Sequence, residues 1–318
     1  MVRSVTMFHF YQISQIFIGI LGNSVMFIFY SYKYFIQSPR RKPIDLIFMH
    51  LMLVNTVSMF KLIPEVMPFF GISQFLDDLG CKLTVYTFRV IRGLPICTTT
   101  LLTFFQAVTI SPSHSKWAWL KLRISGCIFP SLLCFWLINV VTYSHIIRVI
   151  GATSSNGSIF SVRYYQLNCQ PISFDFSSSQ LILSGMVIQE LVFVVLMVGF
   201  SLYMVVLLYR HHQRVRHLLS THLPSSSSPE FRATQNIIML VSCFIVFYFL
   251  NNFLTFYMFL NPEKMVELDH INGVLSSGYP TLCPIILLQN TKIPFLFHHP
   301  VSMVKADFGF KTRSSRQE

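Results

Sequence analysis

Charged residues are scarce in this chain of 318 residues. Asp, Glu, Lys and Arg together make up 11% of the sequence, whereas a soluble globular domain carries about 25%. Hydrophobic residues account for 53%, and the mean hydropathy is +0.57. One soluble core could not bury so much apolar surface, so the composition indicates a polytopic helical membrane protein.

Motifs for catalysis and metal binding are also absent from the sequence. It contains no combination of nucleophile and base, no phosphate-binding loop and no cysteine or histidine spacing typical of a metal site. The net charge of +12 could suggest nucleic acid, but the basic residues form short clusters between apolar runs and no groove-binding motif occurs. The sequence therefore predicts no enzyme, no cofactor or metal, and no nucleic-acid partner.

Long apolar runs occupy most of the chain. The first begins at Phe8, is too long for the core of a signal peptide and is followed by no small-residue cleavage site, so we interpret it as a retained helix. Proline and glycine interrupt the last run, as is tolerated in membrane helices whose neighbours satisfy the backbone. The runs predict transmembrane spans at about residues 8–32, 43–67, 80–110, 123–145, 180–209, 236–260 and 269–289.

The basic residues are distributed unevenly between these spans. Of the 24 Lys and Arg, 16 lie after the odd-numbered spans, five lie in the other connecting or N-terminal segments, and three lie inside spans. Because cytoplasmic loops carry the excess of basic residues, we expect an extracellular N-terminus and a short cytoplasmic tail at 290–318. The predicted fold is an all-α seven-transmembrane helix bundle, forming one domain in the plasma membrane.

Two cysteines and one sequon fall on the predicted extracellular side. Cys81 lies at the start of the third span, and Cys169 lies in the loop between the fourth and fifth spans. Disulfides persist on that oxidising side, and the other five cysteines lie within spans. We therefore predict a Cys81–Cys169 disulfide that ties the loop over the bundle. The sequon Asn156-Gly157-Ser158 is in the same loop, which makes Asn156 a predicted glycosylation site.

Charged residues inside the spans are candidate functional positions, because an ionisable side chain in a membrane is costly. At 1.5 Å per residue, Arg89 and Arg92 lie about 12 and 16 Å below Cys81 in the third span. Glu190 lies at a depth of about 15 Å in the fifth span. These depths allow an Arg–Glu pair. It could be an ion pair that holds helices together, or one arginine could meet a polar or anionic group of a ligand.

Several motifs occur in a consistent order along nearly the whole chain. The most specific are FLDDLGCKLTVYTFRVIRG at 75–93 and CTTTLLTFFQAVTISPSHSKWAWLK at 97–121. Further matching stretches lie at 21–25, 208–218, 228–248 and 279–288. On these motifs the chain resembles the vomeronasal type-1 receptors, a family of seven-helix G-protein-coupled receptors. Like that family, it lacks the D-R-Y of rhodopsin-like receptors, and Phe104-Phe105-Gln106 lies near that position.

The resemblance implies a chemosensory receptor that binds a small pheromone-like ligand in the outer half of the bundle and activates a heterotrimeric G protein of the inhibitory class. Candidate ligand-binding residues are Tyr86, Arg89, Glu190 and Tyr257. Basic residues on the predicted cytoplasmic side could contact the G protein, or could equally bind anionic lipid head groups. These candidates are Lys116, Lys121, Arg210, Arg214, Arg216 and Arg232.

Two other functions fit parts of the pattern. Bitter taste receptors also lack D-R-Y, but they generally lack a disulfide between the third span and the following extracellular loop. A small transporter or channel would favour internal repeats or paired broken helices, whereas this sequence has one interrupted span and no evident repeat. Ligand-stimulated nucleotide exchange on a G protein, as opposed to solute flux, distinguishes a receptor from a transporter.

Overall fold

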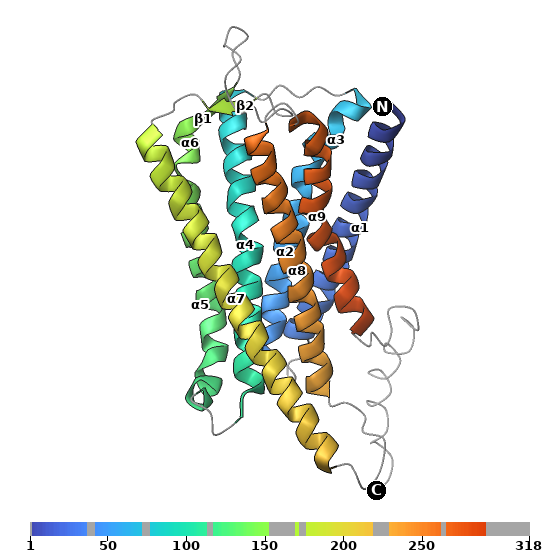
Figure 1. Ribbon diagram of the computed structural model, residues 1–318, viewed down its shortest axis with the longest axis vertical. Coiled ribbons are helices and arrows are strands. Elements are labelled where there is room, and N and C mark those ends of the chain that lie inside the picture. Colours follow the sequence, from blue (N-terminus) through green and yellow to red (C-terminus); the bar gives the residue numbers. More distant parts are fainter. Residues whose placement is uncertain are drawn as a thin grey trace, which may run out of the picture.

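Seven long helices lie side by side in a computed structural model of the chain (Figure 1). The structure describes residues 2–36, 42–71, 77–112, 117–152, 169–171, 176–218, 229–261 and 265–290. The long helices are α1 (Val2–Phe35), α2 (Pro43–Met59), α4 (Asp78–Ile110), α5 (Ala118–Tyr143), α7 (Phe176–Leu218), α8 (Pro229–Leu260) and α9 (Met265–Asn290). In the described residues, six of these helices contain an apolar segment long enough to cross a bilayer, and α2 does so together with the turn that follows it, as far as Leu62. This confirms the predicted seven-helix membrane bundle.

Short elements gather at the upper end of the bundle in Figure 1. They are η2 (Phe60–Leu62), α3 (Ile63–Val66), η3 (Met67–Phe70), α6 (Ile146–Val149), β1 (Ile150–Ala152) and β2 (Cys169–Pro171). The two strands pair antiparallel, with Ala152 opposite Cys169. We call this end the disulfide end, after the Cys81–Cys169 bridge described below, and the other the opposite end.

The second predicted span, 43–67, is not one continuous α-helix. Helix α2 ends at Met59, a 3-10 turn follows, and α3 begins with Pro64 in its first turn. A proline within a continuous helix would remove one backbone hydrogen bond and crowd the preceding turn, whereas the first turn of a new helix does not need the missing N–H. The chain therefore changes its helical geometry immediately before this proline.

Helix α4 is the central element of the bundle. Its apolar segment is 83% buried, and it contacts α2, α5, α6, β1, α7 and α8. Asp77 caps its N-terminus by accepting a 2.8 Å hydrogen bond from the Gly80 backbone N–H. A run of buried threonines follows Pro95, and their hydroxyls donate to carbonyl oxygens of the same helix. The polar groups of these threonines are thus satisfied without water.

Helices α4 and α5 are in close contact at a glycine of α4. A Cβ atom at Gly93 would lie 1.9 Å from Oδ1 of Asn139, and Asn139 is fully buried. The Asn139 amide donates to the Phe135 carbonyl oxygen at 2.8 Å and lies 3.8 Å from Sγ of Cys97. Small residues let membrane helices come together in this way, so any side chain at position 93 would have to displace Asn139.

Helix α9 contains prolines, and α1 compensates for one of them. Pro284 has no N–H, so the carbonyl of Pro280 loses its partner within the helix. Nδ2 of the buried Asn23 in α1 donates to that carbonyl oxygen at 2.8 Å and to the Gly19 carbonyl oxygen at 2.7 Å. The interrupted last span is therefore held in the bundle by an asparagine of the first helix.

A histidine joins α2, α4 and α5. Nε1 of Trp136 donates to Nε2 of His50 at 2.9 Å, and Nδ1 of His50 lies 3.0 Å from Oγ1 of Thr98. Indole nitrogen can only donate, so Nε2 accepts and the histidine proton belongs on Nδ1. The Thr98 hydroxyl donates onward to the Leu94 carbonyl oxygen at 2.8 Å, which gives every member of this junction a complementary role.

Candidate functional site

A disulfide fixes the disulfide end of the bundle. Cys81 in the first turn of α4 is bonded to Cys169 of β2, with Cα atoms 5.6 Å apart. Both cysteines are fully buried, and they pack with Val85 and Tyr143 in a small hydrophobic cluster. The bridge holds β2 over α4, as the sequence led us to expect. Asn156, the predicted glycosylation site, lies outside the described residues.

Glu190 on α7 lies where α5 and α8 meet that helix. Its Oε1 accepts a hydrogen bond of 3.4 Å from the Tyr143 hydroxyl on α5, and its Oε2 accepts one of 2.5 Å from the Tyr248 hydroxyl on α8. The carboxylate is half-buried within the membrane-spanning part of α7. Hydrogen bonds to a charged group are stronger than neutral ones and reduce the cost of placing a charge in a membrane.

Arg92 on α4 contacts the same helix α8 one turn from Tyr248. Its Nη2 donates to Oδ1 of Asn252 at 2.8 Å, and Nδ2 of Asn252 donates to the Tyr248 carbonyl oxygen at 2.8 Å. Within the described helices, Arg92 is thus connected to Glu190 through Asn252 and Tyr248. The direct pairing that their matching depths allowed is replaced by this relay. We refer to Arg92, Tyr143, Glu190, Tyr248 and Asn252 as the polar cluster.

The other predicted ligand-binding residues lie around the polar cluster. Arg89 is half-buried on α4, one turn nearer to the disulfide. The Tyr86 hydroxyl donates to the Val140 carbonyl oxygen at 3.1 Å, so Tyr86 faces α5. Tyr257 is half-buried on α8, about 14 Å from Tyr248 along the helix axis at 1.5 Å per residue. The structure therefore places Tyr86 against the α5 wall and Tyr257 nearer to the disulfide end.

Sequence reasoning overlooked the two tyrosines that bind Glu190. Neither Tyr143 nor Tyr248 stands out in a chain with 13 Tyr and 32 Phe. A weak signal was available for α8, because Tyr248 and Asn252 are four residues apart and share one face of an otherwise apolar helix.

At the opposite end, α4 makes uncharged polar contacts with α8 and α7. Nε2 of Gln106 donates to Oγ1 of Thr234 at 2.9 Å, and both side chains are buried. Oγ of Ser111 lies 2.8 Å from the Tyr203 hydroxyl, and Nζ of Lys121 donates to the Ser111 carbonyl oxygen. Gln106 thus joins α4 to α8 near the position where rhodopsin-like receptors carry D-R-Y.

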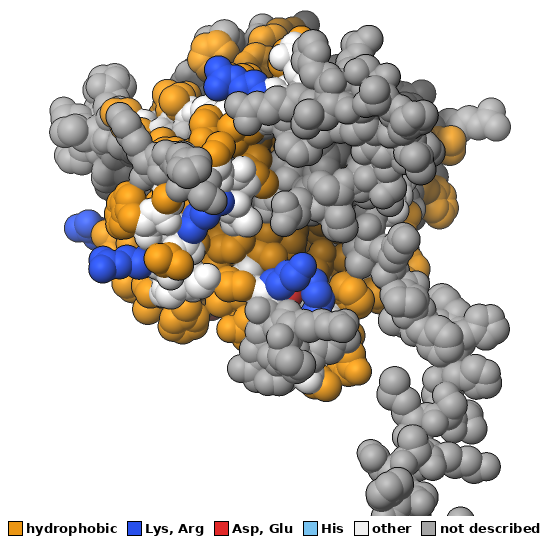
Figure 2. Space-filling model, turned by 90° about the horizontal axis from the view of Figure 1, so that it is seen from below, with side chains coloured by type: hydrophobic (Ala, Val, Ile, Leu, Met, Phe, Trp, Pro, Cys, Tyr) orange, Lys and Arg blue, Asp and Glu red, His pale blue; other side chains and the backbone are white. Residues whose placement is uncertain are grey.

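The predicted G-protein-facing residues are described only in part. Lys121 is half-buried and Arg210 is exposed. Figure 2 shows Lys and Arg side chains at separate points of this end, between hydrophobic side chains. The following lie outside the described side chains: Lys116, Arg214, Arg216 and Arg232.

We expect Thr234→Val to weaken the contact between α4 and α8. Valine keeps the shape of threonine but lacks the oxygen that accepts from the buried Gln106 amide, and loss of such a partner costs about 1–3 kcal/mol. Thermal unfolding of the purified protein should show a lower midpoint for Thr234→Val than for Thr234→Ser, which keeps the hydroxyl. Equal midpoints for the two variants would show that this hydrogen bond does not hold α8 in place.

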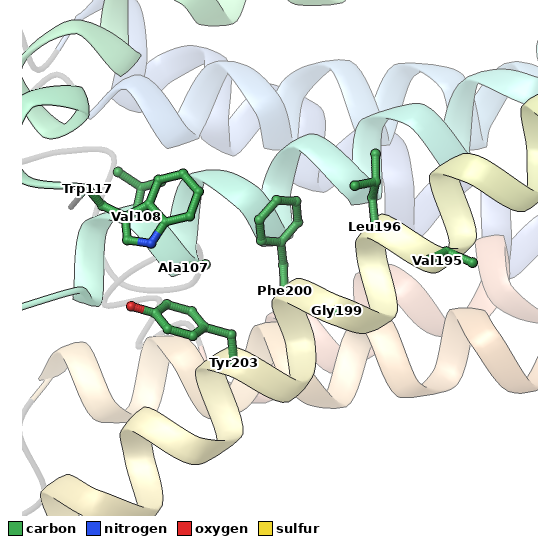
Figure 3. Close-up of a pocket in the computed structure, with 8 residues that line it drawn as sticks. All are labelled: Ala107, Val108, Trp117, Val195, Leu196, Gly199, Phe200 and Tyr203. Carbon is green, nitrogen blue, oxygen red and sulfur yellow. The ribbon is translucent and has the colours of Figure 1, made fainter. Parts of the chain in front are cut away.

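Two apolar grooves open on the sides of the bundle. One, of about 440 Å³, lies between α1 and the segment from Ile63 to Phe70. The other, of about 400 Å³, lies between α4, the start of α5 and α7 (Figure 3). The linings of these two grooves include no member of the polar cluster.

These features define a seven-helix membrane receptor: the bundle of membrane-spanning helices, the disulfide from α4 to β2, and the polar cluster between helices. Comparison with known sequences identifies the family. The sequence model of the vomeronasal organ pheromone receptor family matches residues 6–297. The chain belongs to this family and is a chemosensory G-protein-coupled receptor of the vomeronasal type-1 class, a multi-pass protein of the plasma membrane.

Similar proteins come from several mammals. Vomeronasal type-1 receptor 3 of Homo sapiens is 34% identical over 289 residues, covering 89% of this chain and 91% of that protein. Vomeronasal type-1 receptor 1 of Gorilla gorilla gorilla is 34% identical over 277 residues, covering 86% and 77%. Vomeronasal type-1 receptor 90 of Rattus norvegicus is 30% identical over 275 residues, covering 86% and 88%. These relatives are receptors rather than enzymes, and they favour the vomeronasal class over the bitter-taste and transporter alternatives.

Proposed function

We propose that this receptor binds a small pheromone-like organic ligand beside the polar cluster and, in response, activates a heterotrimeric G protein of the inhibitory class at the opposite end. The observation that carries the proposal is the position of Glu190. Glu190 is on α7, and its carboxylate accepts hydrogen bonds from a tyrosine of α5 and a tyrosine of α8. Arg92 of α4 contacts the same part of α8. Intramembrane charges are rare and usually functional, and here they lie where several helices meet.

A ligand at this position can change how the helices contact one another. The Tyr248 hydroxyl donates to Glu190, and the Tyr248 carbonyl oxygen accepts a hydrogen bond from Asn252. A polar ligand group that competes for the Glu190 carboxylate alters the link between α7 and α8. A ligand shifts a conformational equilibrium by as much as it prefers one state. We assign ligand contact to Glu190, Arg89 and Tyr257, with Tyr86 shaping the α5 wall.

The proposed orientation places the disulfide end outside the cell and the opposite end in the cytoplasm. The distribution of Lys and Arg along the chain supports it, as does the disulfide at one end of the bundle, because disulfides persist in oxidising compartments. In this orientation Asn156 is a glycosylation site. The residues that face the G protein are Lys116, Lys121, Arg210, Arg214, Arg216 and Arg232.

Nucleotide exchange on a co-expressed inhibitory-class G protein tests this proposal. A panel of small volatile and semi-volatile organic compounds should contain at least one that stimulates exchange by the wild-type receptor. Arg89→Ala and Arg92→Gln should reduce the response to that compound by about tenfold or more, because one lost hydrogen bond to a charged group costs about 1.5–3 kcal/mol. The response should disappear when a different G-protein class replaces the inhibitory one.

Lys82→Gln provides a matched loss of positive charge on α4. Lys82 forms an ion pair with Asp78 near the disulfide end, outside the polar cluster, so we expect this variant to respond like wild type. An unchanged response in Arg89→Ala and Arg92→Gln at normal surface level would remove both arginines from the site. Solute flux without nucleotide exchange would overturn the receptor mechanism.

A further inference from the structure

The groove between α4, the start of α5 and α7 (Figure 3) is lined on α7 by Val195 and Leu196, which are exposed on the surface of the bundle within the membrane-spanning part of that helix. Its walls are Ala107 and Val108 of α4, Trp117 before α5, and Phe200 and Tyr203 of α7. Gly199 lies between these α7 aromatics and the exposed Val195. Because no water fills the hydrocarbon region, the occupant of an outward-facing groove at this depth is hydrocarbon.

Gly199 has no side chain, and this leaves space in the groove. A Cβ atom built there meets nothing within 4 Å, so a larger side chain at this position would project into the groove without displacing protein atoms. From Val195 to Tyr203 the groove runs along about 12 Å of α7, at 1.5 Å per residue. This space suits an elongated apolar chain that lies along the helix.

One end of the groove is polar and positively charged. The Tyr203 hydroxyl lies 2.8 Å from Oγ of Ser111, and the Lys121 ammonium donates to the carbonyl oxygen of the same serine. Arg210 is exposed on α7, about 10 Å beyond Tyr203 along the helix and on the same face. The apolar groove therefore leads to two cationic side chains.

The stretches of sequence that form the groove contain no carboxylate. Residues 79–174 and 191–229 contain no Asp or Glu, and these ranges include every residue that lines the groove. A ligand that combines an apolar chain with an anionic head satisfies both parts of the site. A neutral sterol hydroxyl would gain little from the two cations.

We propose that this groove binds one acyl chain of an anionic phospholipid of the cytoplasmic leaflet, with its head group over Lys121 and Arg210. The leaflet assignment follows from the orientation proposed above, whereas the binding chemistry follows from the groove itself. Basic pockets between transmembrane helices on the cytoplasmic side are known to bind anionic head groups. The bound lipid joins α4, α5 and α7 at one site.

Native mass spectrometry of the purified full-length receptor in detergent tests the proposal. Phosphatidylserine and phosphatidylcholine with identical acyl chains are added together. We expect phosphatidylserine to bind about fivefold more tightly or better, because a basic residue near a lipid head group contributes about 1 kcal/mol. Lys121→Gln keeps a donor for the Ser111 carbonyl oxygen but loses the charge, and it should reduce this preference by about fivefold.

Gly199→Phe should fill the groove and weaken the binding of both lipids. Gly126→Phe is the matched control, since Gly126 is an exposed glycine of α5 whose Cβ would also meet nothing within 4 Å. Equal lipid binding by these two variants, or equal binding of the two lipids by wild type, would overturn the proposal. This measurement needs no signalling, so its failure is distinguishable from failure of the proposed receptor mechanism.

Discussion

Replacing Gly93 with alanine is expected to remove most of the folded receptor from the cell surface. The new Cβ would lie 1.9 Å from Oδ1 of Asn139, and Asn139 is fully buried between α4 and α5. Overpacking a tight interior commonly costs about 1–3 kcal/mol, and we expect Gly93→Ala to reach or exceed the upper value. Since a loss of about 1–2 kcal/mol can change the cellular abundance of a protein several-fold, surface staining should fall by several-fold or more.

Two further variants isolate the steric cause. Gly126→Ala adds the same methyl group to an exposed glycine of α5 where nothing lies within 4 Å, so it should be expressed like wild type. The double variant Gly93→Ala with Asn139→Ala removes the clashing oxygen and should recover part of the lost surface receptor. Wild-type expression of Gly93→Ala alone would show that the helices can separate there at little cost.

Replacing Glu190 with alanine is expected to cause the second large loss of stability. The change removes the acceptor of two tyrosine hydroxyls and the only carboxylate of the polar cluster, and each hydrogen bond to a charged group contributes about 1.5–3 kcal/mol. The unfolding midpoint of the purified receptor should fall accordingly. A thiol-reactive dye can report it, because Cys97 and Cys283 are buried in the folded protein.

Glutamine at position 190 is the control for this experiment. Glu190→Gln keeps one oxygen acceptor and the length of the side chain but loses the charge, so its midpoint should lie between those of Glu190→Ala and wild type. The measurement is made in a background where the exposed Cys127 and Cys134 are replaced by serine, so that the dye reports mainly the buried thiols. A midpoint for Glu190→Ala equal to that of wild type would contradict a stabilising role for the cluster.

The seven helices could be predicted from sequence because each crossing needs a long apolar run, and such runs are visible without an alignment. The irregular end of the second span could not be predicted from the sequence. Pro95 and Pro130 lie inside continuous helices, whereas the helix changes its geometry before Pro64. Whether a proline interrupts a helix depends on whether a neighbouring side chain satisfies the carbonyl oxygen that it leaves without a partner. Asn23 of α1 does so for the Pro280 carbonyl oxygen of α9, and these two residues are far apart in the sequence.

For the candidate site, the sequence predicted how deep the charged residues lie in the membrane but not which side chains they contact. A charge within an apolar run identified Glu190 and Arg92, and helical rise gave their heights. Rise along separate helices does not say which side chain faces which, so the partners of these charges came only from the structure. Tyr248 and Asn252 on α8 fill the positions between them.

The hydrogen bond between Gln106 and Thr234 joins α4 to α8 without using a charged group. Ion pairs weaken as salt screens them and as their members gain or lose protons. An amide that donates to a hydroxyl carries no net charge and does not titrate in the physiological range. The contact of α8 with α4 at this end should therefore hold its strength through changes of ionic strength and acidity in the surrounding solution.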